Sequence, residues 1–265
     1  MTMPKKPAMS AWVEQLQSRG CYTFTRSEAE SETERSSVAV QTALRRLKEQ
    51  GRIVSPRRGF YVIVPPEYRV PGSPPASWFI DALMHHLDQP YYVGLLSAAA
   101  IHGAAHQQPM VFQVVTDKPM RETRAGRVTI RFSMNSKVEQ MPATEIQTET
   151  GTMQVATPET TAFDLVRYQA AAGHLSNIAT VLDELAERMD GQALVKIAHL
   201  VKLSDAQRLG FLLDAVGKGD LAGPLAEWLK ARKPRVTLLL SGAPAQGEIN
   251  ERWRVRSNAE LEIEL

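Results

Sequence analysis

The chain has 265 residues, 43% hydrophobic and 6% aromatic, which is ordinary for a globular protein and long enough for two domains. No apolar run approaches the roughly 18 residues of a membrane span, and no signal-peptide core follows the N-terminus. A single cysteine, Cys21, excludes an internal disulfide. We therefore expect a cytoplasmic protein that does not contact a membrane.

The net charge of +2 conceals an asymmetry along the chain. Residues 1–65 contain eleven Lys and Arg against six Glu, a net charge of +5, whereas the remainder contains 20 against 23, a net charge of −3. Affinity for nucleic acid comes largely from neutralising phosphates with Lys and Arg. This distribution is the one expected if only the N-terminal part touches DNA.

Two short helices are predicted first. Residues 8–19 carry apolar side chains at helical spacing and are followed by Gly20, and residues 22–24 favour an extended piece. Thr25 can then cap a second helix that runs through residues 27–30. This second segment carries four acidic side chains, which weigh against a DNA-binding face and which we expect to point sideways or outward: Glu28, Glu30, Glu32 and Glu34.

A third helix is predicted from Ser36 or Ser37, either of which can serve as the N-cap, to the glycine stop at Gly51. Its apolar stripe should face the core, and a second, mostly polar arc should face away from it. The stripe comprises Val40, Ala43, Leu44 and Leu47, and the opposite arc comprises Val38, Gln41, Thr42 and Arg45.

A two-stranded arm follows this helix. Residues 53–54 begin an extended run, residues 55–59 (SPRRG) supply turn chemistry, and residues 60–64 form a β-branched and aromatic strand. A helix followed by a basic arm has the order of a winged helix-turn-helix. In that motif the second helix lies in the major groove and basic groups elsewhere hold phosphates.

The side chains suit this role. The Gln41 amide can form paired hydrogen bonds with adenine, and the Arg45 guanidinium can form them with guanine. Thr42 can contact a thymine methyl group or a phosphate. The alternative is an ordinary surface helix with solvated charges. The complete set of predicted DNA-binding residues is Arg26, Arg35, Ser37, Val38, Gln41, Thr42, Arg45, Arg57 and Arg58.

Residues 65–75 contain five prolines and a glycine, so they favour an extended, stiff conformation. We therefore predict an α+β protein with a winged helix-turn-helix domain at residues 1–65, a Pro-rich linker at 66–75 and a larger mixed α/β domain with a helical block at 76–265.

The larger domain begins with helices and strands and continues as a helical block. Thr157 and Pro158 have the residue types of an N-cap and a first helical position. The predicted helices are 78–87, 93–101, 159–168, 175–189, 192–201, 204–216 and 221–232. The predicted strands are 110–116, 127–132, a hairpin of 145–149 with 152–156, and extended segments at 236–240 and 252–265.

The chain resembles the AbiEi antitoxins of bacterial type IV toxin–antitoxin, or abortive infection, systems, which take part in phage defence. The resemblance lies in the winged helix with its proline linker and in four further segments that together span most of the chain. These are residues 91–103 (YYVGLLSAAAIHG), 114–117 (VVTD), 155–165 (VATPETTAFDL) and 252–258 (RWRVRSN).

The resemblance implies two roles. The winged helix would repress the antitoxin–toxin operon by binding inverted repeats in its promoter, and the C-terminal domain would counter a nucleotidyltransferase-like toxin. Neither role is catalytic, so the resemblance implies no enzyme activity. One alternative is a plain winged-helix transcription regulator whose second domain binds a ligand or dimerises; another is a nuclease with a DNA-targeting module.

Histidine and aspartate residues of the larger domain give only weak signals for a metal site or a catalytic site. His102 and His106 stand four residues apart, but Gly103 lies where the helix should end, so they need not share a face. Asp117 follows a strand, but a partner carboxylate on the next strand is missing. If residues 155–165 formed a functional site, Asp164 would be its candidate residue. A purely structural role explains this segment adequately. We predict no catalytic residue, metal site or cofactor.

A basic cluster surrounds one strand connection in the larger domain. Within the predicted strand, Arg127, Thr129 and Arg131 share one face. The cluster is either a solvated face or a surface that steers an acidic partner, namely the DNA backbone or the carboxylate-lined cleft of a toxin. Its members are Lys118, Arg121, Arg124, Arg127 and Arg131.

Overall fold

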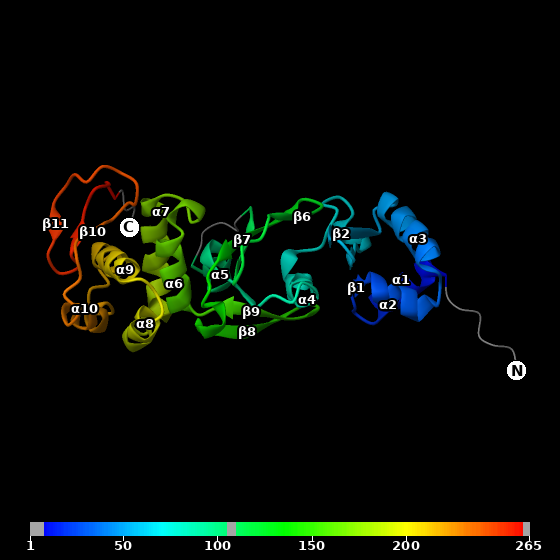
Figure 1. Ribbon diagram of the computed structural model, residues 1–265, viewed down its shortest axis with the longest axis horizontal. Coiled ribbons are helices and arrows are strands. Elements are labelled where there is room, and N and C mark those ends of the chain that lie inside the picture. Colours follow the sequence, from blue (N-terminus) through cyan, green and yellow to red (C-terminus); the bar gives the residue numbers. More distant parts are fainter. Residues whose placement is uncertain (1–7, 105–109, 262–265) are drawn as a thin grey trace, which may run out of the picture.

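The computed structural model describes residues 8–104 and 110–261. The molecule is elongated and has mixed α+β architecture, as predicted. Three regions follow one another along its long axis: a small helical region with three short strands, a central six-stranded sheet, and a helical block with a small terminal sheet (Figure 1). No helix in the described part of the chain is long and apolar enough to cross a membrane.

The N-terminal region contains three helices and a three-stranded sheet. Its elements are α1 (Met9–Ser18), β1 (Thr23–Thr25), α2 (Arg26–Thr33), α3 (Ser37–Glu49), β2 (Ile53–Arg57) and β3 (Phe60–Ile63). The strands pair antiparallel in the order β1-β3-β2. Their own small core is formed by Met9, Trp12, Val13, Phe24, Ala29, Val40, Leu44, Leu47, Ile53 and Ile63.

N-cap hydrogen bonds determine where α2 and α3 begin. The Thr25 side chain accepts from the Glu28 amide while the Glu28 carboxylate accepts from the Thr25 amide, which is a complete capping box. Of the two serines considered for α3, Ser36 is the N-cap, because its hydroxyl accepts from the Ala39 amide at 3.4 Å. The predicted apolar stripe of α3 is confirmed, with Ala43 only partly buried.

The proline-rich segment packs against the central region and is not a free spacer. It contains the 3-10 helices η1 (Pro66–Tyr68) and η2 (Ala76–Trp78). The Arg127 amide donates to the Pro71 carbonyl at 2.8 Å, and a Cβ at Gly126 would lie 2.4 Å from that oxygen. Phe60 of β3 already belongs to the core of the larger region. The junction is therefore held by packing and hydrogen bonds.

The central sheet has the strand order β6-β7-β5-β4-β9-β8, so β6 and β8 are its two edges (Figure 1). The pairs β4–β9 and β5–β7 are parallel, and the other pairs are antiparallel. The strands are β4 (Tyr91–Val93), β5 (Phe112–Thr116), β6 (Thr123–Ala125), β7 (Val128–Met134), β8 (Ala143–Thr148) and β9 (Gly151–Ala156). Two short helices, α4 (Ile80–His86) and α5 (Leu95–Ile101), belong to the same region.

One predicted boundary in this region was wrong, and one strand was missed. Val93, predicted to begin a helix, belongs to strand β4, because Tyr92 and Val93 are buried between neighbouring strands. The helix starts after Gly94, whose Cβ, if present, would lie 2.9 Å from Val115 Cγ2 and 3.0 Å from Asp164 Oδ2. Strand β6 was not predicted, since three residues are too few to show strand periodicity.

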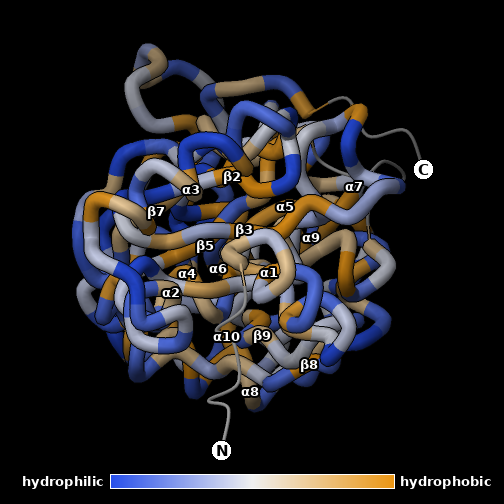
Figure 2. Tube along the Cα trace, turned by 90° about the vertical axis from the view of Figure 1, so that its right-hand side faces the viewer, coloured by the Kyte–Doolittle hydropathy of each residue, from blue (hydrophilic) through white to orange (hydrophobic). Residues whose placement is uncertain are grey.

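The helical block consists of α6 (Pro158–Arg167), α7 (Leu175–Leu185), α8 (Gly191–Ala198), α9 (Leu203–Ala215) and α10 (Gly223–Lys230), with the 3-10 helices η3 (Val138–Gln140), η4 (Gln169–Ala171) and η5 (Ala186–Arg188) nearby or between them. The predicted cap of α6 is confirmed, because the Thr157 hydroxyl accepts from the Thr160 amide. Seen along the long axis, apolar residues gather in the interior around β5 and α6 (Figure 2).

The terminal sheet is shorter than predicted. Its strands are β10 (Thr237–Leu238), β11 (Ile249–Asn250) and β12 (Val255–Arg256), and residues 262–265 lie outside the described part. Trp253 fixes this sheet to α9. Its indole nitrogen donates to Asp214 Oδ2 at 2.6 Å, and its ring occupies the space where a Cβ at Gly210 would be.

Candidate nucleic-acid interface

Helix α3 presents its predicted arc to solvent. Val38 is 74% exposed, and the side chain of Arg45 is 72% exposed. Gln41 is also exposed, whereas Thr42 is half-buried and its hydroxyl donates to the Val38 carbonyl at 3.0 Å. The arc therefore offers an amide and a guanidinium to a partner, while Thr42 bonds back to its own helix.

The guanidinium of Arg45 is lightly tethered. Its Nε lies 3.7 Å from Glu49 Oε1 one turn later, and both side chains are about two-thirds exposed or more. Exposed pairs of this kind contribute little to stability. Arg45 can therefore exchange this carboxylate for another acceptor at low cost.

Arg26 connects α2 to the first turn of α3. Its Nη2 donates to Ser37 Oγ at 2.5 Å, and its Nε donates to Glu30 Oε1 at 2.9 Å. The hydrogen bond that Glu30 accepts from Arg26, and next its hydrogen bond with Ser37, lower the pKa of the Glu30 carboxyl below its ordinary value. Arg26 and Ser37 thus hold α2 against the start of α3, and their role in DNA binding stays a prediction. Arg35 is exposed in the connection between α2 and α3.

At least two of the four predicted acidic side chains have partners within the protein. Glu28 completes the capping box with Thr25, and Glu30 pairs with Arg26. Glu32 is exposed, and Glu34 is the C-cap residue with a left-handed φ of 47°. Two of the four carboxylates are therefore bound to the helix start and to Arg26.

The turn between β2 and β3 lies against the central region and not in open solvent. Arg57 Nη2 donates to the carbonyl of Arg121 at 2.5 Å. Partial burial, and then the nearby charge of Arg121, lower the pKa of the Arg57 guanidinium. The carbonyl of the exposed Arg58 lies 3.2 Å from His86 Nε2, and the His86 ring contacts that of Phe60. The position of the turn is therefore fixed relative to the sheet.

The predicted basic cluster lies at the β6 edge. All five side chains are exposed: Lys118, Arg121, Arg124, Arg127 and Arg131. Arg127 sits in the turn before β7, so only Thr129 and Arg131 of the predicted face belong to the strand. Glu122 bridges Arg124 and Arg131 at 3.1 and 3.3 Å, and these bonds lower the pKa of its carboxyl. Glu122, together with Asp117 beside Lys118, only partly offsets the positive charge of the five side chains.

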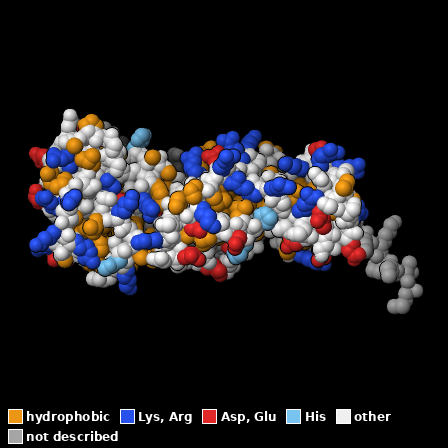
Figure 3. Space-filling view, in the orientation of Figure 1, with side chains coloured by type: hydrophobic (Ala, Val, Ile, Leu, Met, Phe, Trp, Pro, Cys, Tyr) orange, Lys and Arg blue, Asp and Glu red, His pale blue; other side chains and the backbone are white. Residues whose placement is uncertain are grey.

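The arm and the β6 edge form one surface. Strands β2 and β6 are neighbours, and the Arg57–Arg121 bond joins them directly. Figure 3 shows Lys and Arg side chains gathered over β6, β7 and β2 and continuing toward α3. We call this surface the basic band and define it by Arg57, Arg58, Lys118, Arg121, Arg124, Arg127 and Arg131. The sequence placed these residues in two separate groups, and no local pattern signals their contact.

The other candidate groups have structural surroundings. His102 Nε2 lies 2.7 Å from the Ala156 carbonyl, while His106 lies outside the described residues. Across residues 8–104 and 110–261, no three His, Cys, Asp or Glu side chains are placed to hold a metal ion. Asp117 Oδ2 lies 3.8 Å from Lys118 Nζ.

Asp164 is fully enclosed beneath the sheet. The Tyr92 hydroxyl donates to its Oδ1 at 3.3 Å, and Oδ2 has no hydrogen-bond partner among the described residues. Burial raises the pKa of Asp164 to about 7, and the Tyr92 bond and the charge of Arg167 oppose that rise. This carboxyl is a buried structural group of the core that α6 shares with the sheet.

Comparisons with known proteins bear on the fold and on the larger region. Residues 92–215 match the model of the AbiEi antitoxin C-terminal domain. The crystal structure of the RV2827C protein from Mycobacterium tuberculosis is similar, with a TM-score of 0.67 and 15% sequence identity over 96% of this chain and 94% of that one, which shows a shared fold. No curated protein matches the sequence. Residues 92–215 are therefore similar to the AbiEi antitoxin C-terminal domain, which confirms the resemblance predicted from the sequence.

Proposed function

We propose that this protein is a DNA-binding antitoxin of a type IV toxin–antitoxin system, acting in the cytoplasm. It represses its own operon and counters a nucleotidyltransferase-like toxin. The observation that carries the proposal is the exposed arc of α3 beside the basic band, in a chain that also matches the AbiEi antitoxin C-terminal domain.

The DNA-binding half is a winged helix-turn-helix at residues 1–65. Helices α2 and α3 form the helix-turn-helix, and β2 and β3 form the wing. Helix α3 enters the major groove, where Gln41 reads adenine and Arg45 reads guanine. Arg35 and the start of α3 meet the flanking phosphates. The solvent exposure of this face of α3 supports the role, because nothing in the described protein covers Val38, Gln41 or Arg45.

The basic band holds the phosphate backbone of the same duplex. The fixed position of the wing supports this choice over the alternative that the β6 edge steers an acidic toxin cleft. Because Arg57 is bonded to Arg121, a duplex that reaches the wing also meets Arg124 and Arg127. Several phosphate contacts at once give strong, salt-dependent affinity. The operator is inverted repeats in promoter DNA, each read by one copy.

The antitoxin half is the larger region at residues 76–265, with residues 66–75 as the connection. Its partner is the cognate toxin, and its role is binding and not a reaction. The match of residues 92–215 supports the antitoxin role.

The proposal is tested with the full-length protein in two assays. The first measures affinity for DNA from upstream of its own gene, against a scrambled duplex of equal length. The second measures growth when the neighbouring nucleotidyltransferase-like gene is expressed with and without this chain. We expect preferential binding to the promoter and restored growth. Promoter binding without any rescue would instead favour a plain transcription regulator.

A further inference from the structure

One side chain in the exposed arc of α3 is apolar. Val38 lies in the first turn of the helix, is 74% exposed and carries no hydrogen-bonding group on its side chain. An exposed valine contributes nothing to the core, and β-branched residues form helices less well than Ala or Leu. The large hydrophobic side chains that are exposed in the described part of the chain are Val38, Val70, Met110, Met134 and Leu203. Among them, Val38 is the one that α3 carries.

The first turn of α3 is held in place on both sides of Val38. Arg26 Nη2 donates to Ser37 Oγ at 2.5 Å and to the Ser37 carbonyl at 3.4 Å. The Thr42 hydroxyl donates to the Val38 carbonyl at 3.0 Å. A valine in a helix also has one strongly preferred rotamer. The methyl groups of Val38 are therefore presented at a fixed position, and little conformational entropy is lost when they meet a partner.

The charge of this turn favours the approach of a duplex. A helix N-terminus favours acidic side chains in its first turn, but the first turn of α3 contains none. The positive end of the helix dipole therefore stays uncompensated by an acidic side chain of that turn, and no carboxylate there repels a phosphate backbone. Val38 can approach the floor of a groove without that obstacle.

Val38 shares its face of the helix with the two side chains that are proposed to read bases. Gln41 follows three residues later and Arg45 seven residues later. Three residues advance a helix by about 4.5 Å, and one base-pair step advances the duplex by about 3.4 Å. Val38 and Gln41 would therefore meet base pairs that are within one or two steps of each other.

The chemistry of Val38 leaves one partner among the base edges of the major groove. These edges display hydrogen-bond donors and acceptors and a single kind of apolar group, the C5-methyl of thymine. Gln41 and Arg45 suit the donors and acceptors, whereas Val38 suits only the methyl group. Thr42 is a less suitable reader of that methyl group, because Thr42 is half-buried and its hydroxyl is bonded to its own helix.

We propose that Val38 selects one thymine in each half-site of the operator by packing its methyl groups against the C5-methyl of that base. The thymine lies within one or two base pairs of the adenine that Gln41 reads. This inference rests on the proposed DNA-binding function and adds a base, and the residue that selects it, to the specificity of α3.

The test uses the full-length protein and labelled promoter duplexes. In each duplex, one thymine per half-site is replaced by deoxyuridine, which lacks the C5-methyl but keeps every hydrogen-bonding group. We expect one of these replacements to weaken wild-type binding about fourfold per half-site, because this is the value of burying one methyl-sized group. Fluorescence anisotropy at constant salt measures the affinities.

Val38→Ala separates Val38 from the other contacts of α3. Because Val38 is exposed, its truncation leaves the core intact. The variant should bind the unmodified promoter about fourfold more weakly per half-site and should lose nothing further on the sensitive deoxyuridine duplex. The matched control is Val70→Ala, which makes the same change at a valine that is 81% exposed and lies outside α3. This control should keep the full sensitivity of wild type to deoxyuridine.

Two results would overturn the role of Val38. One is a wild-type affinity that no deoxyuridine replacement changes, and the other is equal sensitivity of wild type and Val38→Ala at every thymine. If Gln41→Ala still lowers promoter affinity in either case, base reading by α3 stands and only the role of Val38 fails. Equal wild-type affinity for promoter and scrambled DNA would instead contradict the proposed DNA-binding function and this inference together.

Discussion

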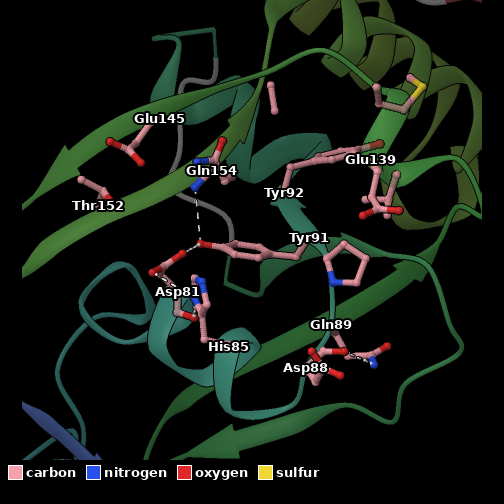
Figure 4. Close-up of a pocket in the computed structure, with 14 residues that line it drawn as sticks. Asp81, His85, Asp88, Gln89, Tyr91, Tyr92, Glu139, Glu145, Thr152 and Gln154 are labelled. Atoms are coloured by element: carbon pink, nitrogen blue, oxygen red, sulfur yellow. Dashed lines mark hydrogen bonds and ion pairs between the residues drawn. The ribbon is translucent and has the colours of Figure 1, made fainter.

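The two edges of the central sheet differ in both charge and cover. The β6 edge is basic and packs against the arm of the N-terminal region through Arg57 and Arg121. The β8 edge has no strand beyond it in the described structure and lies beside an acidic cavity whose lining holds four carboxylates (Figure 4). One sheet therefore separates a surface suited to phosphates from a surface suited to basic groups (Figure 3).

This difference shows that a net charge of only +2 conceals two surfaces of opposite charge. The Debye length is about 8 Å at physiological salt, so charges on opposite edges of a sheet scarcely influence one another. The local arrangement of charge, and not its sum, decides which partner each edge attracts.

The largest expected effect is on the free energy of unfolding and comes from Asp164, in the core between the two edges. The pKa of Asp164 is raised from an ordinary 3.8 to about 7, so between these values the folded protein holds a proton that the unfolded chain has lost. The stability contributed by this proton is fully present below about pH 4 and disappears as pH rises through 7. The free energy of unfolding should fall by at most about 1.4 kcal/mol per pH unit across this window.

Asp164→Asn should remove this dependence. In urea titrations at pH 5, 6, 7 and 8, the stability of the Asn variant relative to wild type should increase by about 1 kcal/mol per unit up to pH 7 and then level off. Parallel pH profiles for the two proteins would contradict the assigned burial. Affinities at the two edges should therefore be compared at one fixed pH.

The next largest effect is on affinity for promoter DNA and comes from the β6 edge. Arg124→Glu/Arg127→Glu should reduce affinity for promoter DNA at least tenfold near 0.1 M salt, because two phosphate contacts become repulsions. Lys196→Glu/Lys230→Glu reverses two exposed charges in the helical block and should change affinity far less. Fluorescence anisotropy with labelled duplex measures both. Equal losses in the two variants would mean that net charge matters and the basic band does not.

A smaller effect is expected at the wing. Arg58→Ala should weaken binding to promoter and scrambled DNA alike and lower the log–log salt slope by about 1, because it removes one phosphate contact. Titrations at several salt concentrations would reveal this slope. An unchanged slope would place Arg58 outside the DNA interface.

The smallest effect on DNA should come from the β8 edge. Glu139→Lys/Glu145→Lys should leave promoter affinity within about threefold of wild type, since these residues face away from the basic band. The same anisotropy assay applies. A tenfold gain in affinity would show that the duplex passes near the acidic edge and would remove the contrast between the edges.

The sequence predicts most of this architecture where local chemistry decides it. Capping residues located α2, α3 and α6, and turn residues located the β8–β9 hairpin. Where local patterns were ambiguous, burial against other elements determined the secondary structure. Residues 91–93 are a strand because neighbouring strands enclose them, and the terminal strands depend on Trp253 filling the space above Gly210.

For the candidate interface, the sequence predicted residues but not their arrangement in space. Helical spacing alone separated Val38, Gln41 and Arg45 from the apolar stripe of α3. The contact between Arg57 and Arg121 spans 64 positions, so no local signal could reveal it. The acidic cavity was missed for the same reason, because Asp81, Glu139 and Glu145 come from three separate elements.

The central claim is that α3 reads base edges while the basic band holds phosphates. The most direct measurement compares Gln41→Ala and Arg45→Ala on promoter and scrambled duplexes under identical salt. We predict that each variant loses about 1 to 3 kcal/mol on promoter DNA and much less on scrambled DNA. Equal losses on both duplexes would contradict base reading by α3.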